Sequence, residues 1–195
     1  MRKVYAFDFD GTLTTRDTLI AFIRYVAGTK ALRLGFLRYA PLLVLMKLGL
    51  YPNWKAKQKV FSHFFKGMDY STFKACGHNF AEDSSRLLRP EAVKLIGELV
   101  ERKEEVVIVT ASIEEWVQPF FPGAKVLATK VEVDANGCLT GRFLTKNCYG
   151  QEKVDRVRSM YPDRDDYYLI AYGDSRGDRE LLAFADEAHY KPFRV

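Results

Sequence analysis

Cysteine is scarce in this sequence. The 195 residues include three cysteines, Cys76, Cys138 and Cys148, and no two of them form a Cys-x-x-Cys pair. An odd number without paired spacing argues against a disulfide framework and against a zinc site. We therefore expect a protein of a reducing compartment, the cytoplasm.

Acidic residues are missing from one long stretch. Residues 18–68 contain no Asp or Glu but nine Lys and Arg, and since the whole chain has a net charge of +5, the remainder carries −4. This part of the protein is expected to face something anionic, such as a phosphorylated substrate or the inner face of an acidic membrane. A solvated basic helical surface would have the same composition. Nucleic acid is not expected as a partner.

Long uncharged hydrophobic runs are also lacking. The most Leu-rich segment, residues 32–50, is interrupted by Arg33, Arg38 and Lys47, and its longest uncharged piece is 39–46. A membrane-spanning helix needs about 20 apolar residues. The segment is expected to lie against the protein core or on a membrane surface. Because an apolar, strand-like run begins directly at the start of the chain, no signal peptide is expected.

The sequence does contain an alternation of short apolar runs and amphipathic segments. Its pattern predicts strands at 4–7, 106–110, 126–128 and 167–172, and helices at 18–26, 90–102, 151–160 and 179–184. An Asn136-Gly137 pair predicts a tight hairpin around it, because glycine readily takes the positive φ of such turns. Buried strands that alternate with helices predict an α/β fold with a three-layer, Rossmann-like, mostly parallel sheet.

A block of helices interrupts this alternation after the first strand. Residues 28–89 are predicted to form several helices, with breaks near Gly28, Pro41, Gly49/Pro52 and Gly67. The block is best explained as a helical cap inserted into the core. The predicted domains are therefore a core of residues 1–14 and 90–195 and a cap of residues 15–89.

Polar residues follow the carboxyl ends of the predicted strands, where open α/β sheets bind their ligands. They are Asp8 and Asp10 after the first strand, Thr110 after the second, Asp174 and Asp178 after the last, and Lys153 near the start of a helix. Carboxylates gathered at one edge repel each other, and a cation relieves that repulsion. Their hard oxygen atoms suit Mg²⁺, and a lysine and a hydroxyl beside them would hold the oxygens of a phosphoryl group.

The order of these residues resembles four motifs of the haloacid dehalogenase superfamily. Residues 8–14, Asp-Phe-Asp-Gly-Thr-Leu-Thr, are similar to its first motif, D-x-D-G-[TS], and residues 106–110 to its second, an apolar strand that ends in Ser or Thr. Lys153 resembles the third motif, and residues 173–178, Gly-Asp-Ser-Arg-Gly-Asp, resemble the fourth. With helices between motifs one and two, the chain resembles the phosphoserine-phosphatase-like branch, subfamily IB, which carries a C1-type cap.

The resemblance implies a Mg²⁺-dependent phosphatase. Asp8 would attack phosphorus and become an aspartyl-phosphate, while Asp10 would protonate the leaving oxygen and then activate water. The metal would be bound by Asp8, the Asp10 backbone carbonyl and Asp174. Asp178 would either contact the metal from outside or orient its ligands.

The resemblance also assigns residues to the substrate. The phosphoryl group would be bound by the Thr110 hydroxyl, the Lys153 ammonium and the Ala111 backbone N–H. Phosphoserine phosphatases hold the amino acid with a Glu shortly after motif one and an Arg in the cap. By offset from Asp8 the first position matches Asp17, and by alignment of the cap the second matches Lys59. Because lysine cannot form the bidentate fork of arginine, phosphoserine is disfavoured as the substrate.

Three functions stay open at this point. The first is a phosphomonoester hydrolase in the cytosol that acts on a small phosphorylated metabolite. The second is a peripheral membrane phosphatase of a phospholipid headgroup, since the Leu-rich, basic cap resembles subfamily IB members that act on phosphatidylglycerophosphate. The third is a phospho-acceptor module that does not hydrolyse its phosphoaspartate, against which Asp10 and the cap argue. The sequence does not predict an oligomeric state.

Overall fold

The computed structural model describes residues 2–194. Its strands are β1 (Arg2–Phe7), β2 (Glu105–Ile113), β3 (Lys125–Thr129), β4 (Val131–Val133), β5 (Leu139–Phe143), β6 (Tyr167–Gly173) and β7 (Glu187–Tyr190). Its helices are α1 (Thr18–Lys47), α2 (Asn53–Phe65), α3 (Tyr70–Asp83), α4 (Pro90–Glu101), α5 (Glu114–Val117), α6 (Gln151–Met160) and α7 (Arg179–Phe184). Short helical turns lie at Phe9–Leu13, Ser85–Leu87, Gln118–Phe120, Arg164–Asp166 and Arg176–Asp178.

Five strands form a parallel sheet in the order β3-β2-β1-β6-β7. The central strand β1 pairs with β2 up to Phe7↔Ile108 and with β6 up to Phe7↔Tyr172. The residues that follow these three strands therefore meet at one edge of the sheet. Strand β7 was not predicted, because its sequence Glu-Ala-His-Tyr lacks an apolar run and most of it is exposed at the edge of the sheet.

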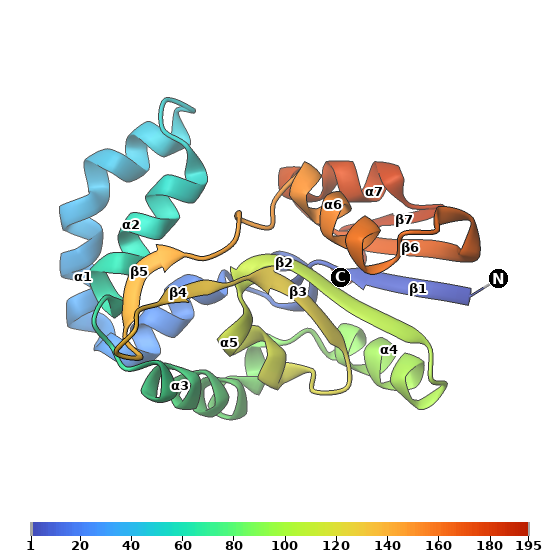
Figure 1. Ribbon diagram of the computed structural model, residues 1–195, viewed down its shortest axis with the longest axis horizontal. Coiled ribbons are helices and arrows are strands. Elements are labelled where there is room, and N and C mark those ends of the chain that lie inside the picture. The colour runs from blue at the N-terminus through green and yellow to red at the C-terminus, as the bar shows by residue number, and fades with distance from the viewer. Residues whose placement is uncertain (1, 195) are drawn as a thin grey trace.

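Helices cover both faces of the sheet, as Figure 1 shows, with α6 and α7 on one face and α4 and α5 on the other. Side chains alternate along a strand, so β1 serves both layers. Val4 and Ala6 pack in the cluster that contains Val154 of α6, and Phe7 packs in the cluster that contains Trp116 of α5. The predicted three-layer α/β fold is confirmed.

Helices α1, α2 and α3 lie between β1 and α4 in the sequence and stand beside the sheet (Figure 1). Helix α1 begins after Asp17, whose side chain accepts the Ile20 N–H at 3.2 Å, and it kinks at Gly28, where φ is +81°. The predicted break near Pro41 is wrong, since the helix continues to Lys47. Pro41 lies on an exposed face, where water can satisfy the carbonyl that loses its N–H partner.

The hairpin β4–β5 packs against α2. The rings of Phe61 and Phe143 lie 5.4 Å apart, and the Phe143 N–H donates to Gln58 at 2.9 Å. The Asn136-Gly137 turn has the expected positive φ at Gly137. This hairpin belongs to the sequence range predicted as core but lies against a cap helix, so the boundaries 1–14 with 90–195 and 15–89 stay a prediction.

Candidate active site

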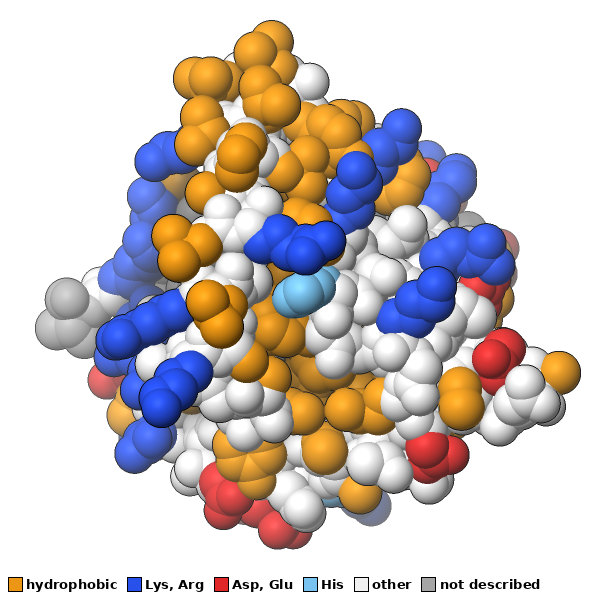
Figure 2. All heavy atoms as spheres, turned by 90° about the vertical axis from the view of Figure 1, so that its left-hand side faces the viewer, with side chains coloured by type: hydrophobic (Ala, Val, Ile, Leu, Met, Phe, Trp, Pro, Cys, Tyr) orange, Lys and Arg blue, Asp and Glu red, His pale blue; other side chains and the backbone are white. Residues whose placement is uncertain are grey.

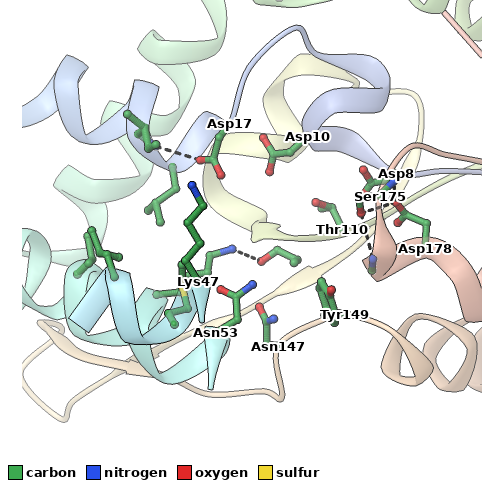
Figure 3. Close-up of a pocket in the computed structure, with 18 of the residues that line it drawn as sticks. Asp8, Asp10, Asp17, Lys47, Asn53, Thr110, Asn147, Tyr149, Ser175 and Asp178 are labelled. Atoms are coloured by element: carbon green, nitrogen blue, oxygen red, sulfur yellow. Dashed lines mark hydrogen bonds between the residues drawn. The ribbon is translucent and has the colours of Figure 1, made fainter. Parts of the chain in front are cut away.

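A cavity of about 720 Å³ lies between the edge of the sheet and the helices α1 and α2 (Figure 3). Its core wall consists of Asp8, Asp10, Thr110, Ala111, Asn147, Tyr149, Lys153, Ser175, Gly177 and Asp178. Its cap wall consists of Asp17, Leu19, Ile20, Phe36, Leu43, Met46, Lys47, Asn53, Lys57 and Val60. The cavity therefore joins most of the sequence-predicted site residues with a largely apolar surface.

Asp8 and Lys153 form a buried ion pair at the base of the cavity. Asp8 directly follows β1, and its N–H donates to the Tyr172 carbonyl of β6 at 2.9 Å. Lys153 Nζ lies 2.5 Å from Asp8 Oδ1, 2.6 Å from Asp178 Oδ1 and 2.7 Å from the Val109 carbonyl oxygen. Three acceptors match the three hydrogens of an ammonium, so Lys153 is held firmly beside Asp8.

Burial has the largest effect on the pKa values of Asp8 and Lys153. It raises the pKa of Asp8 to about 7, with the nearby charges of Asp178 and Asp10 adding to the rise and Lys153 opposing it. Burial alone would lower the pKa of Lys153, but Asp8 and Asp178 outweigh that effect and raise it. A further cation beside Asp8 would favour its carboxylate form.

Asp10 is clamped by the start of α1 and the end of β2. Its Oδ1 accepts the Thr18 N–H at 2.7 Å, and its Oδ2 accepts the Ser112 hydroxyl. Burial raises the pKa of Asp10, and the charge of Asp17 adds to that rise, so the protonated form of Asp10 is favoured. The sequence analysis missed Ser112 and Thr18. Ser112 stands two residues beyond Thr110, so strand alternation places both on one face and was a usable signal.

Thr110 and Ala111 present polar groups of β2 to the cavity. Thr110 Oγ1 accepts the Ser112 N–H at 3.0 Å, which leaves the hydroxyl hydrogen to donate to a ligand. The Ala111 carbonyl accepts from Lys57 Nζ at 2.7 Å and from Thr129 Oγ1 at 2.9 Å. The peptide at Ala111 is therefore fixed from both the cap and the core.

The acidic cluster fits a divalent cation. Asp8, Asp174 and Asp178 each present a carboxylate oxygen within 4.8 Å of the others. Gly11, at φ +82°, allows this approach, because a Cβ there would lie 2.6 Å from Asp174 Oδ2. The Thr12 hydroxyl bridges the two sides, at 3.3 Å from Asp174 and 3.4 Å from Asp8. Such a set of hard oxygen donors suits Mg²⁺.

Asp178 is bonded on both oxygens. Besides Lys153, it accepts the Ser175 N–H at 2.9 Å, the Ser175 hydroxyl at 2.8 Å and the Asp174 N–H at 3.2 Å. Burial would raise the pKa of Asp178, but Lys153 and these hydrogen bonds hold it below its usual value. Of the two roles that the sequence left open, this geometry favours the one in which Asp178 orients Lys153 and the loop of Asp174.

The cap residues that reach the cavity differ in part from those expected. Asp17 lines it while capping α1. Lys59 does not line it; this side chain is exposed, with Nζ 5.6 Å from the ring centroid of Tyr51. Lys57 enters the cavity instead, where burial lowers its pKa against the opposing charges of Asp10 and Asp17. Residues two apart on a helix point about 200° apart, so Lys57 and Lys59 lie on opposite faces of α2.

Comparisons with known proteins identify relatives of the whole chain and of its fold. CicA of Caulobacter vibrioides is 36% identical over 193 residues, which cover 97% of this chain and 86% of CicA. A protein of unknown function from Bordetella pertussis Tohama I has a similar crystal structure, with a TM-score of 0.80, 22% identity, and 95% of this chain and 87% of that chain covered. A phosphoserine phosphatase from T. onnurineus has a TM-score of 0.62 and 23% identity, with 97% and 84% covered.

These solved structures share the fold of this chain, and the resemblance stated from the four motifs is confirmed. The family model described as haloacid dehalogenase-like hydrolase matches residues 5–183. The protein therefore belongs to the haloacid dehalogenase-like hydrolase family.

Proposed function

We propose that the protein is a Mg²⁺-dependent phosphomonoester hydrolase that works through an aspartyl-phosphate on Asp8. The observation that carries this proposal is the meeting of Asp8, Asp10, Thr110 and Lys153 in one cavity. Membership of a hydrolase family supports the reaction class. The similar structures include phosphoserine phosphatases, one of them described as a phospho-aspartyl intermediate analogue, which supports a phosphate ester as the bond that is broken.

In the first step, an Asp8 carboxylate oxygen attacks phosphorus. The bond from phosphorus to the leaving oxygen breaks as the aspartyl-phosphate forms, and the leaving oxygen takes the proton of Asp10. The Thr110 hydroxyl donates to a phosphoryl oxygen, and the positive charge of Lys153, held beside Asp8, stabilises the charge that develops on the phosphoryl group. Thr18 and Ser112 keep Asp10 in place for the proton transfer.

In the second step, water attacks the same phosphorus. Asp10, now a carboxylate, takes a proton from this water, and the bond between phosphorus and the Asp8 oxygen breaks. Inorganic phosphate leaves, and both carboxyl groups return to their starting states. The hydrogen bonds of Asp10 serve both steps because the same carboxyl group first gives up and then regains one proton.

Asp8, Asp174 and the backbone carbonyl of Asp10 would hold the Mg²⁺. When bound, the cation supplies positive charge that keeps Asp8 ionised and balances the phosphoryl oxygens. Asp178 would not need to contact it, because its role is to hold Lys153 and the Asp174 loop.

The substrate we propose is a small phosphorylated compound whose leaving group has both polar and apolar parts. Asp17 and Lys57 place one negative and one positive group near Asp10, the proposed proton donor to the leaving oxygen. Most of the remaining cap wall is apolar, with Leu19, Phe36 and Leu43 among its side chains. Such a wall favours an apolar portion beyond the phosphate.

Phosphate release from a set of phosphomonoesters, measured with Mg²⁺ and with EDTA, tests this function. The wild type should turn over in Mg²⁺, stop in EDTA and recover when Mg²⁺ is returned. Asp8→Asn should lower kcat at least about 10³-fold, since it removes the nucleophile and keeps the shape. The matched control is Asp165→Asn, an exposed carboxylate outside the cavity, which should keep full activity.

Two results would count against the proposal. If Asp8→Asn kept its activity, Asp8 would not be the nucleophile. If labelled phosphate stayed on Asp8 while no phosphomonoester turned over, the protein would be a phospho-acceptor module and not a hydrolase.

A further inference from the structure

Helix α1 exposes a stripe of large apolar side chains. Beyond the kink at Gly28, the first three of these side chains are three and then seven residues apart, which places them on one face of the helix, and two more follow directly past its end. The exposed fractions are 67% for Leu34, 71% for Leu37, 56% for Val44, 66% for Leu48 and 72% for Leu50. We call these five residues the apolar stripe.

The other face of the same helix is already covered by α2. A Cβ at Gly35 would lie 2.4 Å from the ring of Phe64, and the ring of Tyr39 lies 5.4 Å from that of His63. Helix α1 is thus apolar on two faces, of which α2 covers one. A contiguous exposed apolar surface on a folded protein marks a binding surface, so the apolar stripe calls for a partner.

The charges around the stripe indicate the chemical character of its partner. Figure 2 shows hydrophobic side chains gathered at the top of this face, Lys and Arg side chains on both sides of them, and acidic side chains mainly at the lower and outer margins. Arg33, Arg38 and Lys47 stand on the same helix, within a segment, residues 18–68, that has no Asp or Glu. The partner should therefore have an apolar interior that receives the stripe and an anionic surface that meets the flanking Lys and Arg.

We propose that the apolar stripe and its basic neighbours dock the cap on an anionic lipid bilayer. The leucines would enter the headgroup and acyl boundary while the arginines and lysines lie at the phosphates. No helix within residues 2–194 is long and apolar enough to cross a membrane, so the helix would lie in the interface. A second copy is disfavoured, because a two-fold contact sets the same basic residues against each other.

The stripe adjoins the cavity. A shallow apolar groove beside it is lined by residues of α1, among them Leu37 and Val44 of the stripe and Phe36, Leu43 and Lys47 of the cap wall. Figure 3 shows Lys47 extending from the cap into the cavity. Docking would bring the cavity to the bilayer surface, and the substrate class would then be a phosphomonoester of an amphiphile held in that bilayer, an inference that rests on the proposed function.

Co-sedimentation with vesicles tests the docking. The full chain should bind vesicles of phosphatidylcholine with phosphatidylglycerol, and its partition coefficient should fall about tenfold or more on phosphatidylcholine alone or in high salt. The variant Leu34→Gln/Leu37→Gln/Leu48→Gln should lose about tenfold in partitioning to the anionic vesicles. The matched control is Val93→Gln/Val100→Gln, which changes exposed apolar residues of α4 and should bind like the wild type.

Failure of the docking and failure of the proposed function are separable. Asp8→Asn should bind vesicles like the wild type, because docking needs no turnover. The triple variant should hydrolyse a soluble phosphomonoester at the wild-type rate, which also shows that it is folded. Absent binding by the wild type, or equal binding by the triple variant, would overturn the proposal. The proposal would also be overturned if the wild type bound no vesicles but formed a dimer in sedimentation equilibrium, and the triple variant were a monomer.

Discussion

The two walls of the cavity are built in different ways. On the core wall, Lys153 has an acceptor for each ammonium hydrogen, and Asp178 and Asp10 accept on both of their oxygens. The cap wall is mainly aliphatic and aromatic, and the stripe next to it is open to solvent. Reaction geometry requires atoms fixed to fractions of an ångström, whereas a leaving group needs a surface that fits its shape. The core wall therefore suits the chemistry and the cap wall the choice of substrate.

The largest effect is expected from Lys153 of the core wall. Lys153→Met leaves Asp8 and Asp178 as neighbouring buried carboxylates, so the free energy of unfolding should fall by about 3–5 kcal/mol. Turnover should fall at least about 10³-fold, because the positive charge beside Asp8 and the phosphoryl group is lost. Urea unfolding and phosphate release measure the two effects, with exposed Lys146→Met as the control. Unchanged stability would mean that the buried ion pair is not formed in solution.

The joint between cap and core should give the next largest effect. A Cβ at Gly77 of α3 would lie 2.2 Å from the Glu115 backbone oxygen of α5, so Gly77→Ala should destabilise the protein by about 1–3 kcal/mol. Gly97→Ala on α4 is the matched control, because nothing lies within 4 Å of a Cβ there and alanine favours the helix. Measured by thermal unfolding, the Tm of Gly77→Ala should be lower than that of the wild type, and the Tm of Gly97→Ala should not be. Equal Tm values would indicate that the cap moves away from α5 at little cost.

Lys57 and Lys59 test the cap wall itself. Lys57→Met should raise KM about tenfold with a smaller change in kcat, because it removes a cation from the leaving-group side of the cavity. Lys59→Met lies on the same helix but outside the cavity and should leave both constants unchanged. Steady-state kinetics on one soluble phosphomonoester gives the comparison. If Lys59→Met changed KM and Lys57→Met did not, the assignment of Lys57 rather than Lys59 to the cavity wall would be wrong.

The smallest effect is expected from a partly exposed ion pair of the core, Arg164 with Asp186, which does not line the cavity. Asp186 accepts from Arg164 and from the Leu169 N–H, both at 2.7 Å. Burial would raise its pKa, but these hydrogen bonds and the charge of Arg164 hold it below the usual value. The folded state therefore favours the carboxylate. Its contribution is present above the ordinary Asp pKa of about 3.9 and is lost as the pH falls through the lowered folded value.

The comparison is between the wild type and Asp186→Asn. Their difference in unfolding free energy should be under about 1 kcal/mol at neutral pH and should vanish in acid. Urea unfolding across the acid range measures it. A difference that grew as the pH fell would contradict the lowered pKa of Asp186.

Several features were determined by the sequence alone, because each depends on only a few neighbouring residues. Apolar runs predicted β1, β2, β3 and β6, and the residues at their carboxyl ends predicted which side chains meet, since parallel strands end at a common edge. Asp8, Asp10, Thr110 and Lys153 line one cavity as expected. The turn at Gly137 and the kink at Gly28 followed from the conformational freedom of glycine.

Only the tertiary structure decided the rest. The edge strand β7 depends on hydrogen bonds from its neighbour β6, and the clamp on Asp10 depends on Thr18 and Ser112 arriving from two different elements. Whether Lys57 or Lys59 enters the cavity depends on how α2 is rotated about its own axis. The exposure of the apolar stripe depends on which face of α1 packs on α2. A local pattern specifies an element and its faces, but the partner that each face meets is set by contacts between residues far apart in the chain.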